Sequence, residues 1–544
     1  MPLILEACGG TAAPASNASA PASGSGSNAY PTYTPYANKP KPDYPSIGPL
    51  YEDGYDNYPA NPVKSVATPP GKGSDVSIFS IGLFPPPNPL DQNPAWKAVN
   101  KDVNANIKFN IVSITDYATK MSTTMAGGTS GLPDLIFFYT PPGASSAIGS
   151  YTGAPEFITG AMADLTPYLA GNAAKDYPNL AAIPTNSWKS SGSVYQGKLW
   201  MVPIHRSPIG FPFFKNDNIY DAEIGKDYKP KNGADFKRVL TALNKPNENR
   251  WALGQIATVF WTGLFGAPNN WRLESSGKLT KAWETPEFKQ GLTYLNDLWK
   301  AGLFHPKTLQ YTNVNAQRTD YAQGNWVVWL DQFGNGWQDF WRQGLKAKGY
   351  NFNIIPPFSA LDGGKPVNYF GGGFLGATAV KKGSPDRVKE LLGVLNYLAA
   401  PFGSQEDLLL TSGVKGADYN LDPKGNPVLT RQGNADANYV PWKYVAQHPA
   451  VIYTPDIPNY AKTLSAAEKQ LVPIGVSDPT FGLISATQLS KGRPLETTVA
   501  SAMTDIVVGR RPLSDWDQVV KDYLSKGGEQ IRTEFQKAIV AASK

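Results

Sequence analysis

The 544-residue sequence predicts an α/β protein of two lobes with extra helices at its C-terminal end. Strand and helix patterns alternate from residue 74 onward, which is typical of βαβ units and a parallel sheet. The roughly 470 residues of this part exceed what one hydrophobic core usually holds, so we expect two lobes. In such sheets, ligands bind at the carboxyl ends of the strands.

The first lobe opens with a strand, a helix and a second strand. Polar and apolar residues alternate over 75–81 and again over 107–114, which predicts two strands. Between them, the apolar residues of 94–103 have helical spacing. A third, buried strand is predicted over 132–139 and ends at Tyr139. Such βαβ units imply a parallel sheet with right-handed crossovers.

Capping residues mark the later helices. Thr285, followed by a proline, predicts the start of a helix that Gly302 ends. Ser384, also followed by a proline, opens a second helix. Ser514 opens a third, which runs to Gly527. The last of these predicts the additional helical part at the C-terminal end.

Cys8 is the only cysteine of the chain, so it has no partner for an intramolecular disulfide. A leucine three positions before it, an alanine directly before it and two glycines after it resemble the lipidation box of bacterial lipoproteins. We therefore interpret residues 1–8 as the remainder of a lipoprotein signal, with Cys8 as the lipidation site. The alternative is an unmodified cysteine near the N-terminus.

Residues 9–73 consist mainly of Ala, Ser, Gly, Asn, Pro and Tyr, with almost no aliphatic clusters. Such a segment buries too little apolar surface to offset the entropy of ordering, which predicts a flexible tether. The alternative is that part of the tyrosine-rich stretch, residues 33–58, packs on the folded domain as an extended arm.

Composition narrows the classes of partner. The net charge of +6 is spread over the chain without a run of five or six like charges, so we do not expect a nucleic-acid partner. The sequence also has no run of about 18 apolar residues that would cross a bilayer. Charged residues make up only 17%, while 14 Trp and 27 Tyr are present, which favours an uncharged, hydroxyl-rich ligand.

Several short segments occur in the order found in one protein family. They resemble segments of the extracellular solute-binding proteins of bacterial ABC importers, specifically the carbohydrate-binding lipoproteins related to maltose-binding protein. The segments are 115–117, 131–135 (Gly-Leu-Pro-Asp-Leu), 164–169 (Asp-Leu-Thr-Pro-Tyr-Leu), 197–203 (Gly-Lys-Leu-Trp-Met-Val-Pro), 213–217, 298–306 and 412–419.

The resemblance implies a two-lobe periplasmic-binding-protein-like fold in which the lobes close on a ligand like a Venus flytrap. It implies lobe 1 from residues 74–205 plus 374–440, lobe 2 from 206–373 plus 441–544, and hinge residues Pro203, Gly372 and Gly373.

The function that the resemblance implies is capture of a carbohydrate, expected to be an oligosaccharide, and its delivery to the transmembrane subunits of an ABC permease. The chain would be an extracytoplasmic monomer, held by its lipid anchor to the outer face of the cell membrane, without a cofactor. His205, His305 and His448 are far apart and have no cysteine near them, so we expect no metal site.

Aromatic rings stack on the apolar faces of sugars, and carboxylates accept pairs of sugar hydroxyls. The alternative for each tryptophan is core packing, and for Arg206 an ion pair within the hinge. The expected ligand-binding residues are Trp329, Asp331, Trp261, Trp271, Tyr139, Arg206 and Trp442.

Two other functions stay open. A tethered glycosidase would need two carboxyl groups at a fixed separation, and Asp331 is the best single candidate, without a partner that the sequence identifies. A binding protein for a non-sugar solute such as a peptide is the other. Residues 371–376 match G-x-G-x-x-G, but a strand pattern follows them, which disfavours a dinucleotide site.

Overall fold

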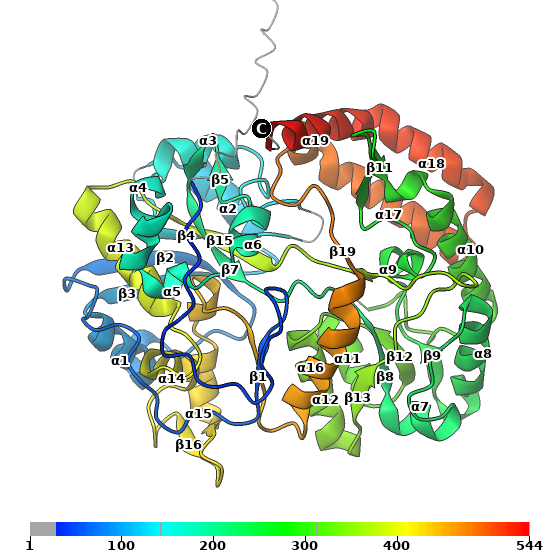
Figure 1. The fold of residues 1–544 in the computed structure, drawn as a ribbon, viewed down its shortest axis with the longest axis horizontal. Coiled ribbons are helices and arrows are strands. Elements are labelled where there is room, and N and C mark those ends of the chain that lie inside the picture. Colours follow the sequence, from blue (N-terminus) through cyan, green and yellow to red (C-terminus); the bar gives the residue numbers. More distant parts are fainter. Residues whose placement is uncertain (1–28, 130, 142–143, 312–313, 543–544) are drawn as a thin grey trace, which may run out of the picture.

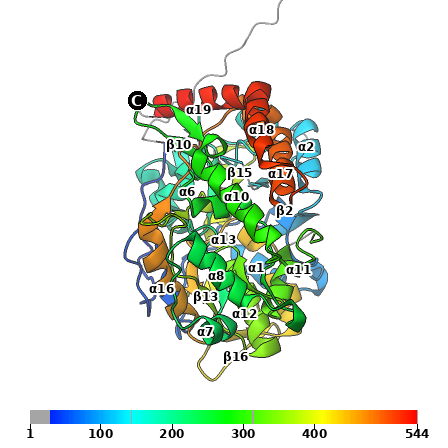
Figure 2. The same ribbon diagram turned by 90° about the vertical axis from the view of Figure 1, so that its right-hand side faces the viewer.

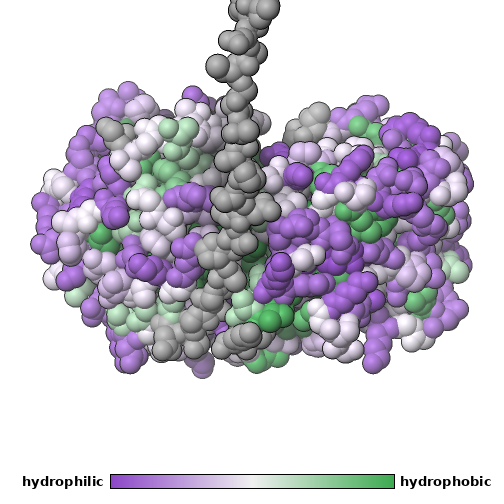
Figure 3. All heavy atoms as spheres, turned by 90° about the horizontal axis from the view of Figure 1, so that it is seen from above, coloured by the Kyte–Doolittle hydropathy of each residue, from purple (hydrophilic) through white to green (hydrophobic). Residues whose placement is uncertain are grey.

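Two lobes lie side by side, each built around its own sheet (Figure 1). Seen from above, both lobes have a mostly hydrophilic surface (Figure 3). The predicted signal remnant and lipidation site Cys8 lie outside the described residues. The computed structural model describes residues 29–129, 131–141, 144–311 and 314–542.

A five-stranded sheet forms the centre of lobe 1. Its strands are β2 (Asp75–Gly82), β3 (Asn106–Ser113), β4 (Leu135–Tyr139), β7 (Met201–His205) and β15 (Phe374–Val380). They are arranged in the order β3-β2-β4-β15-β7. β2 is parallel to β3 and β4, as the sequence predicts, whereas β15 is antiparallel to both of its neighbours.

Helices cover both faces of this sheet. The predicted helix over 94–103 is confirmed: Asn93 caps it by accepting the N–H of Trp96, and Asn104 ends it in the left-handed conformation. The lobe-1 helices are α1 (Pro94–Val103), α2 (Tyr117–Ala126), α3 (Ala154–Ala161), α4 (Thr166–Leu169), α5 (Pro178–Ala181), α6 (Thr185–Ser190), α13 (Pro385–Leu398), α14 (Gln405–Ser412) and α15 (Arg431–Gly433).

Lobe 2 contains a four-stranded sheet of β8 (Phe213–Asn216), β9 (Trp251–Leu253), β12 (Trp326–Leu330) and β13 (Phe352–Ile354). The strand order is β13-β8-β12-β9, and only the β12–β9 pair is parallel. Its helices are α7 (Asp217–Glu223), α8 (Gly233–Leu243), α9 (Thr258–Gly263), α10 (Pro286–Lys300), α11 (Val314–Ala322), α12 (Asn335–Lys348) and α16 (Tyr460–Leu471).

The C-terminal helices α17 (Arg493–Val507), α18 (Trp516–Tyr523) and α19 (Glu529–Ala542) lie together at one end of the molecule in both ribbon views (Figures 1 and 2). The ring of Trp516 stacks on Phe288 of α10 with 5.4 Å between centroids, so α18 belongs to the core of lobe 2.

Ten further strands form short two-stranded pairs. The pairs are β1 (Asp53–Tyr55) with β18 (Val451–Tyr453), β5 (Val194–Tyr195) with β6 (Lys198–Leu199), β10 (Trp271–Leu273) with β11 (Leu279–Lys281), β14 (Asn368–Tyr369) with β19 (Gly475–Val476), and β16 (Tyr419–Leu421) with β17 (Pro427–Leu429).

Residues 29–73 form an arm that is packed on the protein. Ala29 is buried in the lobe-1 core, and β1 pairs with β18. The rings of Tyr55 and Tyr58 pack on Phe402 at 4.7 and 5.1 Å. The prediction of a flexible tether is therefore wrong from Ala29 onward, because tyrosine rings and backbone pairing supply the burial that aliphatic residues do not.

The chain passes between the lobes at two segments that lie side by side. The N–H of Arg206 donates to the carbonyl of Gly373 at 3.0 Å, and the N–H of Gly371 donates to the carbonyl of Pro208 at 2.8 Å. Gly373 has φ of 72°, a conformation that favours glycine. Pro203 lies within the sheet, opposite Ala377 of β15, rather than at the crossing itself.

The third crossing comes later than the sequence predicts. Trp442, Val445 and Ala446 belong to the lobe-1 core, beyond the expected boundary at residue 440, because their side chains pack beneath α1 and β3 residues. Further on, Ser145 of lobe 1 accepts the N–H of Gly482 at its carbonyl, 2.8 Å away, before the chain enters α17.

Candidate functional site

The parallel strands of lobe 1 end at a common edge, where the sequence places the ligand. β2 leads directly to Leu83 and Phe84, whose side chains are 37% and 41% exposed. β3 ends at Ser113, and its hydroxyl donates to the carboxylate of Asp116 at 2.8 Å. β4 ends at the half-buried Tyr139. This edge therefore carries both ring faces and hydrogen-bonding groups.

A polar groove of about 360 Å³ adjoins the edge between β3 and α2. Asn110, Ser113, Asp116, Lys120 and Thr124 contribute hydrogen-bonding side chains to its lining. Amides, hydroxyls and charged groups of this kind bind hydroxyl-rich ligands.

A segment far along the chain, residues 434–447, covers the same edge. The ring of Tyr439 stacks on Phe84 with 5.7 Å between centroids and 10° between planes. The ammonium group of Lys443 lies 4.6 Å from the centroid of Phe84 and donates to the side-chain oxygen of Asn438 at 3.4 Å. A cation over a ring is held there by the ring quadrupole.

Arg206 is tied to this segment at the hinge. Its Nη1 donates to Oε1 of Gln447 at 2.6 Å and to the carbonyl of His205 at 2.7 Å. Burial, together with the charge of Arg206, lowers the pKa of Lys443 to about 8. Burial also lowers the pKa of Arg206.

Lobe 2 contributes a network of ion pairs. Arg318 donates to both oxygens of Asp331, at 2.6 and 2.9 Å, and to Asp339 of α12 at 3.2 Å. Asp331 also accepts the indole N–H of Trp329 at 3.2 Å and the backbone N–H of Gln332 at 2.7 Å. The Asp331 carboxylate therefore has four donors around it and holds lobe 2 together.

The charge of Asp339 acts on lobe 1. It raises the pKa of Lys443 against the effect of burial, and it raises the pKa of Tyr444, which burial alone brings above its ordinary value. Asp339 is therefore a lobe-2 carboxylate whose charge reaches Lys443 of lobe 1. We call Phe84, Arg206, Asp339, Tyr439 and Lys443 the interlobe site.

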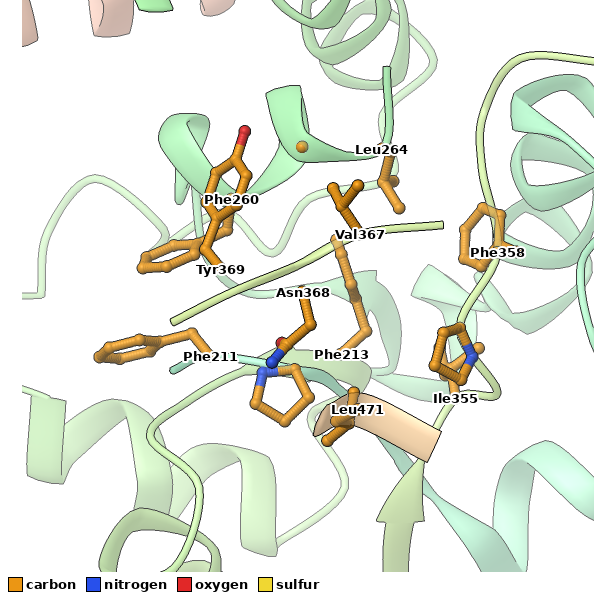
Figure 4. A pocket seen from close by; sticks show the side chains of 13 residues that line it. Phe211, Phe213, Phe260, Leu264, Ile355, Phe358, Val367, Asn368, Tyr369 and Leu471 are labelled. Atoms are coloured by element: carbon orange, nitrogen blue, oxygen red, sulfur yellow. The ribbon is translucent and has the colours of Figure 1, made fainter. Parts of the chain in front are cut away.

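An aromatic pocket lies in lobe 2 next to the hinge (Figure 4). The rings of Phe211 and Phe260 lie on one side, 4.6 Å apart, and Phe358 lies on the other. Tyr369 and Asn368 of β14 complete the wall from the second crossing. Its volume of about 40 Å³ matches one or two water molecules and is too small for a sugar ring in this conformation.

The structure places four of the expected tryptophans inside cores, each with at most 3% of its surface exposed. Trp329 and Trp261 lie in the lobe-2 cores. Trp271 packs against Phe535 of α19, and Trp442 belongs to the lobe-1 core. Their rings pack on neighbouring side chains because such rings bury more apolar surface there than at an open edge.

The other three expected residues have different positions. Arg206 lies in the interlobe site. Asp331 is 2% exposed and paired with Arg318, so it is not free to accept sugar hydroxyls. Tyr139 lies at the lobe-1 edge, with its ring edge-on to Tyr117.

Sequence reasoning missed Phe84, Tyr439, Lys443 and Asp339. Phe84 follows a predicted strand directly, so the rule that ligands bind at the carboxyl ends of strands was a signal for it. For the other three, the long sequence separation leaves no local signal.

Among the residues that the structure describes, no group of three or more His, Cys, Asp or Glu side chains is arranged to hold a metal ion.

Within the described ranges, no helix combines the length and the apolar character needed to span a bilayer.

No protein-family model matches the chain. The chain is 25% identical over 487 residues to lipoprotein LipO of Bacillus subtilis strain 168, covering 85% of this chain and 92% of that protein. It is also 25% identical over 500 residues to the polygalacturonan/rhamnogalacturonan-binding protein YtcQ of the same strain, covering 87% and 93%.

Solved structures with a similar fold include an extracellular solute-binding protein from Bifidobacterium longum subsp. infantis, with a TM-score of 0.63 and 14% identity over 89% of this chain and all of that one. The Streptococcus pneumoniae ABC-transporter substrate-binding protein FusA, in complex with kestose, has a TM-score of 0.61 and 15% identity over 86% and 99%. YtcQ and these two structural neighbours are binding proteins rather than enzymes. The resemblance expected from the sequence is confirmed, and the chain has the two-lobe fold of the extracellular solute-binding proteins of ABC importers.

Proposed function

We propose that this chain is the substrate-binding component of an ABC importer, which captures an oligosaccharide between its lobes and delivers it to a membrane permease. The observation that carries the proposal is the exposed ring of Phe84, which follows β2 directly, stacks on Tyr439 and lies 4.6 Å from the ammonium group of Lys443. An exposed ring stacks on the apolar face of a sugar, and the surrounding polar groups bind its hydroxyls.

The relatives support a carbohydrate as the ligand. YtcQ is a polygalacturonan/rhamnogalacturonan-binding protein, and the FusA structure contains the sugar kestose. The LipO relative is a lipoprotein, which supports an extracytoplasmic position with a lipid anchor at Cys8. The chain would work as a monomer that presents the loaded, closed form to the permease.

Binding without turnover fits the surroundings of Asp331. A glycosidase needs one carboxyl group that donates a proton and a second that acts as base or nucleophile. Asp331 is held by hydrogen bonds from Arg318, Trp329 and a backbone N–H in the interior of lobe 2, where it is 2% exposed. We therefore propose a structural role for it and no catalytic role.

The test is a titration of the full chain with neutral and acidic oligosaccharides, followed by tryptophan fluorescence, with analysis of each ligand for products afterwards. We expect saturation with intact ligand, and about tenfold weaker binding for Phe84→Ala. Tyr33→Ala, which removes an exposed ring from the arm, is the matched control and should bind as the unmodified chain does. Cleaved product, or no saturation with any saccharide, would refute the proposal.

A further inference from the structure

Two cations of the interlobe site have no anionic partner. Among the residues that the structure describes, neither Arg206 nor Lys443 has a carboxylate oxygen within 4.0 Å of its charged nitrogens. Arg206 is bonded to neutral oxygens of His205 and Gln447, and Lys443 to the neutral amide of Asn438.

The neighbouring carboxylates of lobe 2 are bonded to other cations. Asp331 and Asp339 are both bonded to Arg318. Asp456 forms an ion pair with Arg342, whose Nη2 lies 2.9 Å from Oδ1. These three carboxylates and the guanidinium groups of Arg318 and Arg342 leave one negative charge on the lobe-2 side, whereas the lobe-1 side keeps two positive charges that have no ion-pair partner.

Glu52 of the arm is the remaining carboxyl group that acts on Arg206. Burial raises the pKa of Glu52 well above that of a free glutamate, so its carboxyl group is a poor source of neutralising charge near neutral pH. The backbone N–H of Glu52 donates to both carboxylate oxygens of Glu468.

A half-buried cation without an anionic partner loses part of its hydration free energy, and its contacts with neutral groups replace only a small part of that loss. An incoming carboxylate would recover this loss through charge-assisted hydrogen bonds. The ring pair of Phe84 and Tyr439 lies directly beside Lys443, so a sugar ring stacked on Phe84 would bring its substituents to the ammonium group.

We infer that the interlobe site selects a saccharide that carries a carboxylate, such as a uronic acid, which pairs with Lys443 and Arg206 while its ring stacks on Phe84. This inference rests on the proposed function and deepens it, because it gives the chemical class of the sugar. It also replaces the expectation of an uncharged ligand, which rested on overall composition, with one that rests on the local charge.

The test compares an oligogalacturonate with its fully methyl-esterified form of equal length, by titration calorimetry on the full chain. Esterification removes the charge and keeps the ring, so we expect about 10- to 100-fold weaker binding of the ester. Lys443→Met keeps the apolar stem over Phe84 and should remove most of this preference. Lys389→Met, an exposed lysine of α13, is the matched control and should leave it unchanged.

Lys443→Arg guards against misfolding as the cause, because it restores the charge and should restore the preference. Equal affinity for acid and ester, or binding of neutral oligosaccharides alone, would overturn the inference and leave the proposed function standing. Absence of binding to every saccharide would overturn both.

Discussion

The backbone N–H of Glu52 in the arm donates to both carboxylate oxygens of Glu468 in α16, at 3.2 and 3.3 Å. The two glutamates are 8% and 1% exposed, so two carboxyl groups share one buried position where the arm packs on α16. Burial raises the pKa of each, and for Glu468 the nearby Glu52 raises it further.

This pair makes the stability of the protein depend on pH. Because both pKa values are raised in the folded state above the ordinary value of 4.5, folding is favoured by protonation. The contribution is fully present below about pH 4.5 and is lost as the pH rises through the raised values. Glu468→Gln should therefore raise the free energy of unfolding at pH 8 by about 1–2 kcal/mol and flatten its pH profile.

Urea denaturation at pH 5 and pH 8 measures this effect. The control is Glu156→Gln, an exposed glutamate of α3, which should change the free energy of unfolding by less than about 0.5 kcal/mol. An unchanged pH profile for Glu468→Gln would show that the pair is charged in the folded protein.

The buried ion pair of Asp331 and Arg318 should matter for stability rather than for ligand chemistry. Asp331→Asn leaves the guanidinium group without its main counter-charge, and we expect a loss of about 3 kcal/mol in the free energy of unfolding. Asp339→Asn, whose carboxyl group is 50% exposed, should cost less than about 1 kcal/mol. Equal losses in chemical denaturation would contradict the structural role given to Asp331.

The hinge glycines differ in what they require. Gly373 has φ of 72°, so Gly373→Ala should destabilise the fold by about 1–2 kcal/mol. Gly371 has no positive φ, and a methyl group there would meet only the carbonyl oxygen of Pro208 at 3.9 Å. Gly371→Ala is therefore the control and should be nearly neutral in thermal unfolding; the reverse order would refute this assignment of backbone strain.

Binding of an acidic saccharide should weaken at alkaline pH. The pKa of Lys443 is lowered to about 8, so its charge is present below that pH and is lost above it. Tyr444 next to it, whose pKa burial raises to about 12, stays neutral in this range. We expect about tenfold weaker binding at pH 9.5 than at pH 6.5 in calorimetry, and a flatter profile for Lys443→Arg. A profile that is the same for both proteins would exclude Lys443 as the titrating group.

Local sequence patterns were enough to predict individual strands and helices. Alternation predicted β2 and β3 to within a residue, since apolar spacing follows directly from the strand period. Caps at Asn93, Thr285 and Ser384 accept the N–H groups at the starts of α1, α10 and α13, and these bonds depend only on residues three positions apart.

Which aromatic rings are exposed at the interlobe site and which fill a core could be seen only in the folded structure. A tryptophan satisfies a core and a sugar site with the same apolar face, so composition did not separate Trp329 and Trp442 from Phe84. The same holds for the arm, where burial depends on partners such as Phe402 that are more than 300 residues away. The interlobe site joins Phe84, Arg206, Asp339 and Lys443, and the physical reason it was not predictable is that their electrostatic and stacking contacts exist only once both lobes have folded.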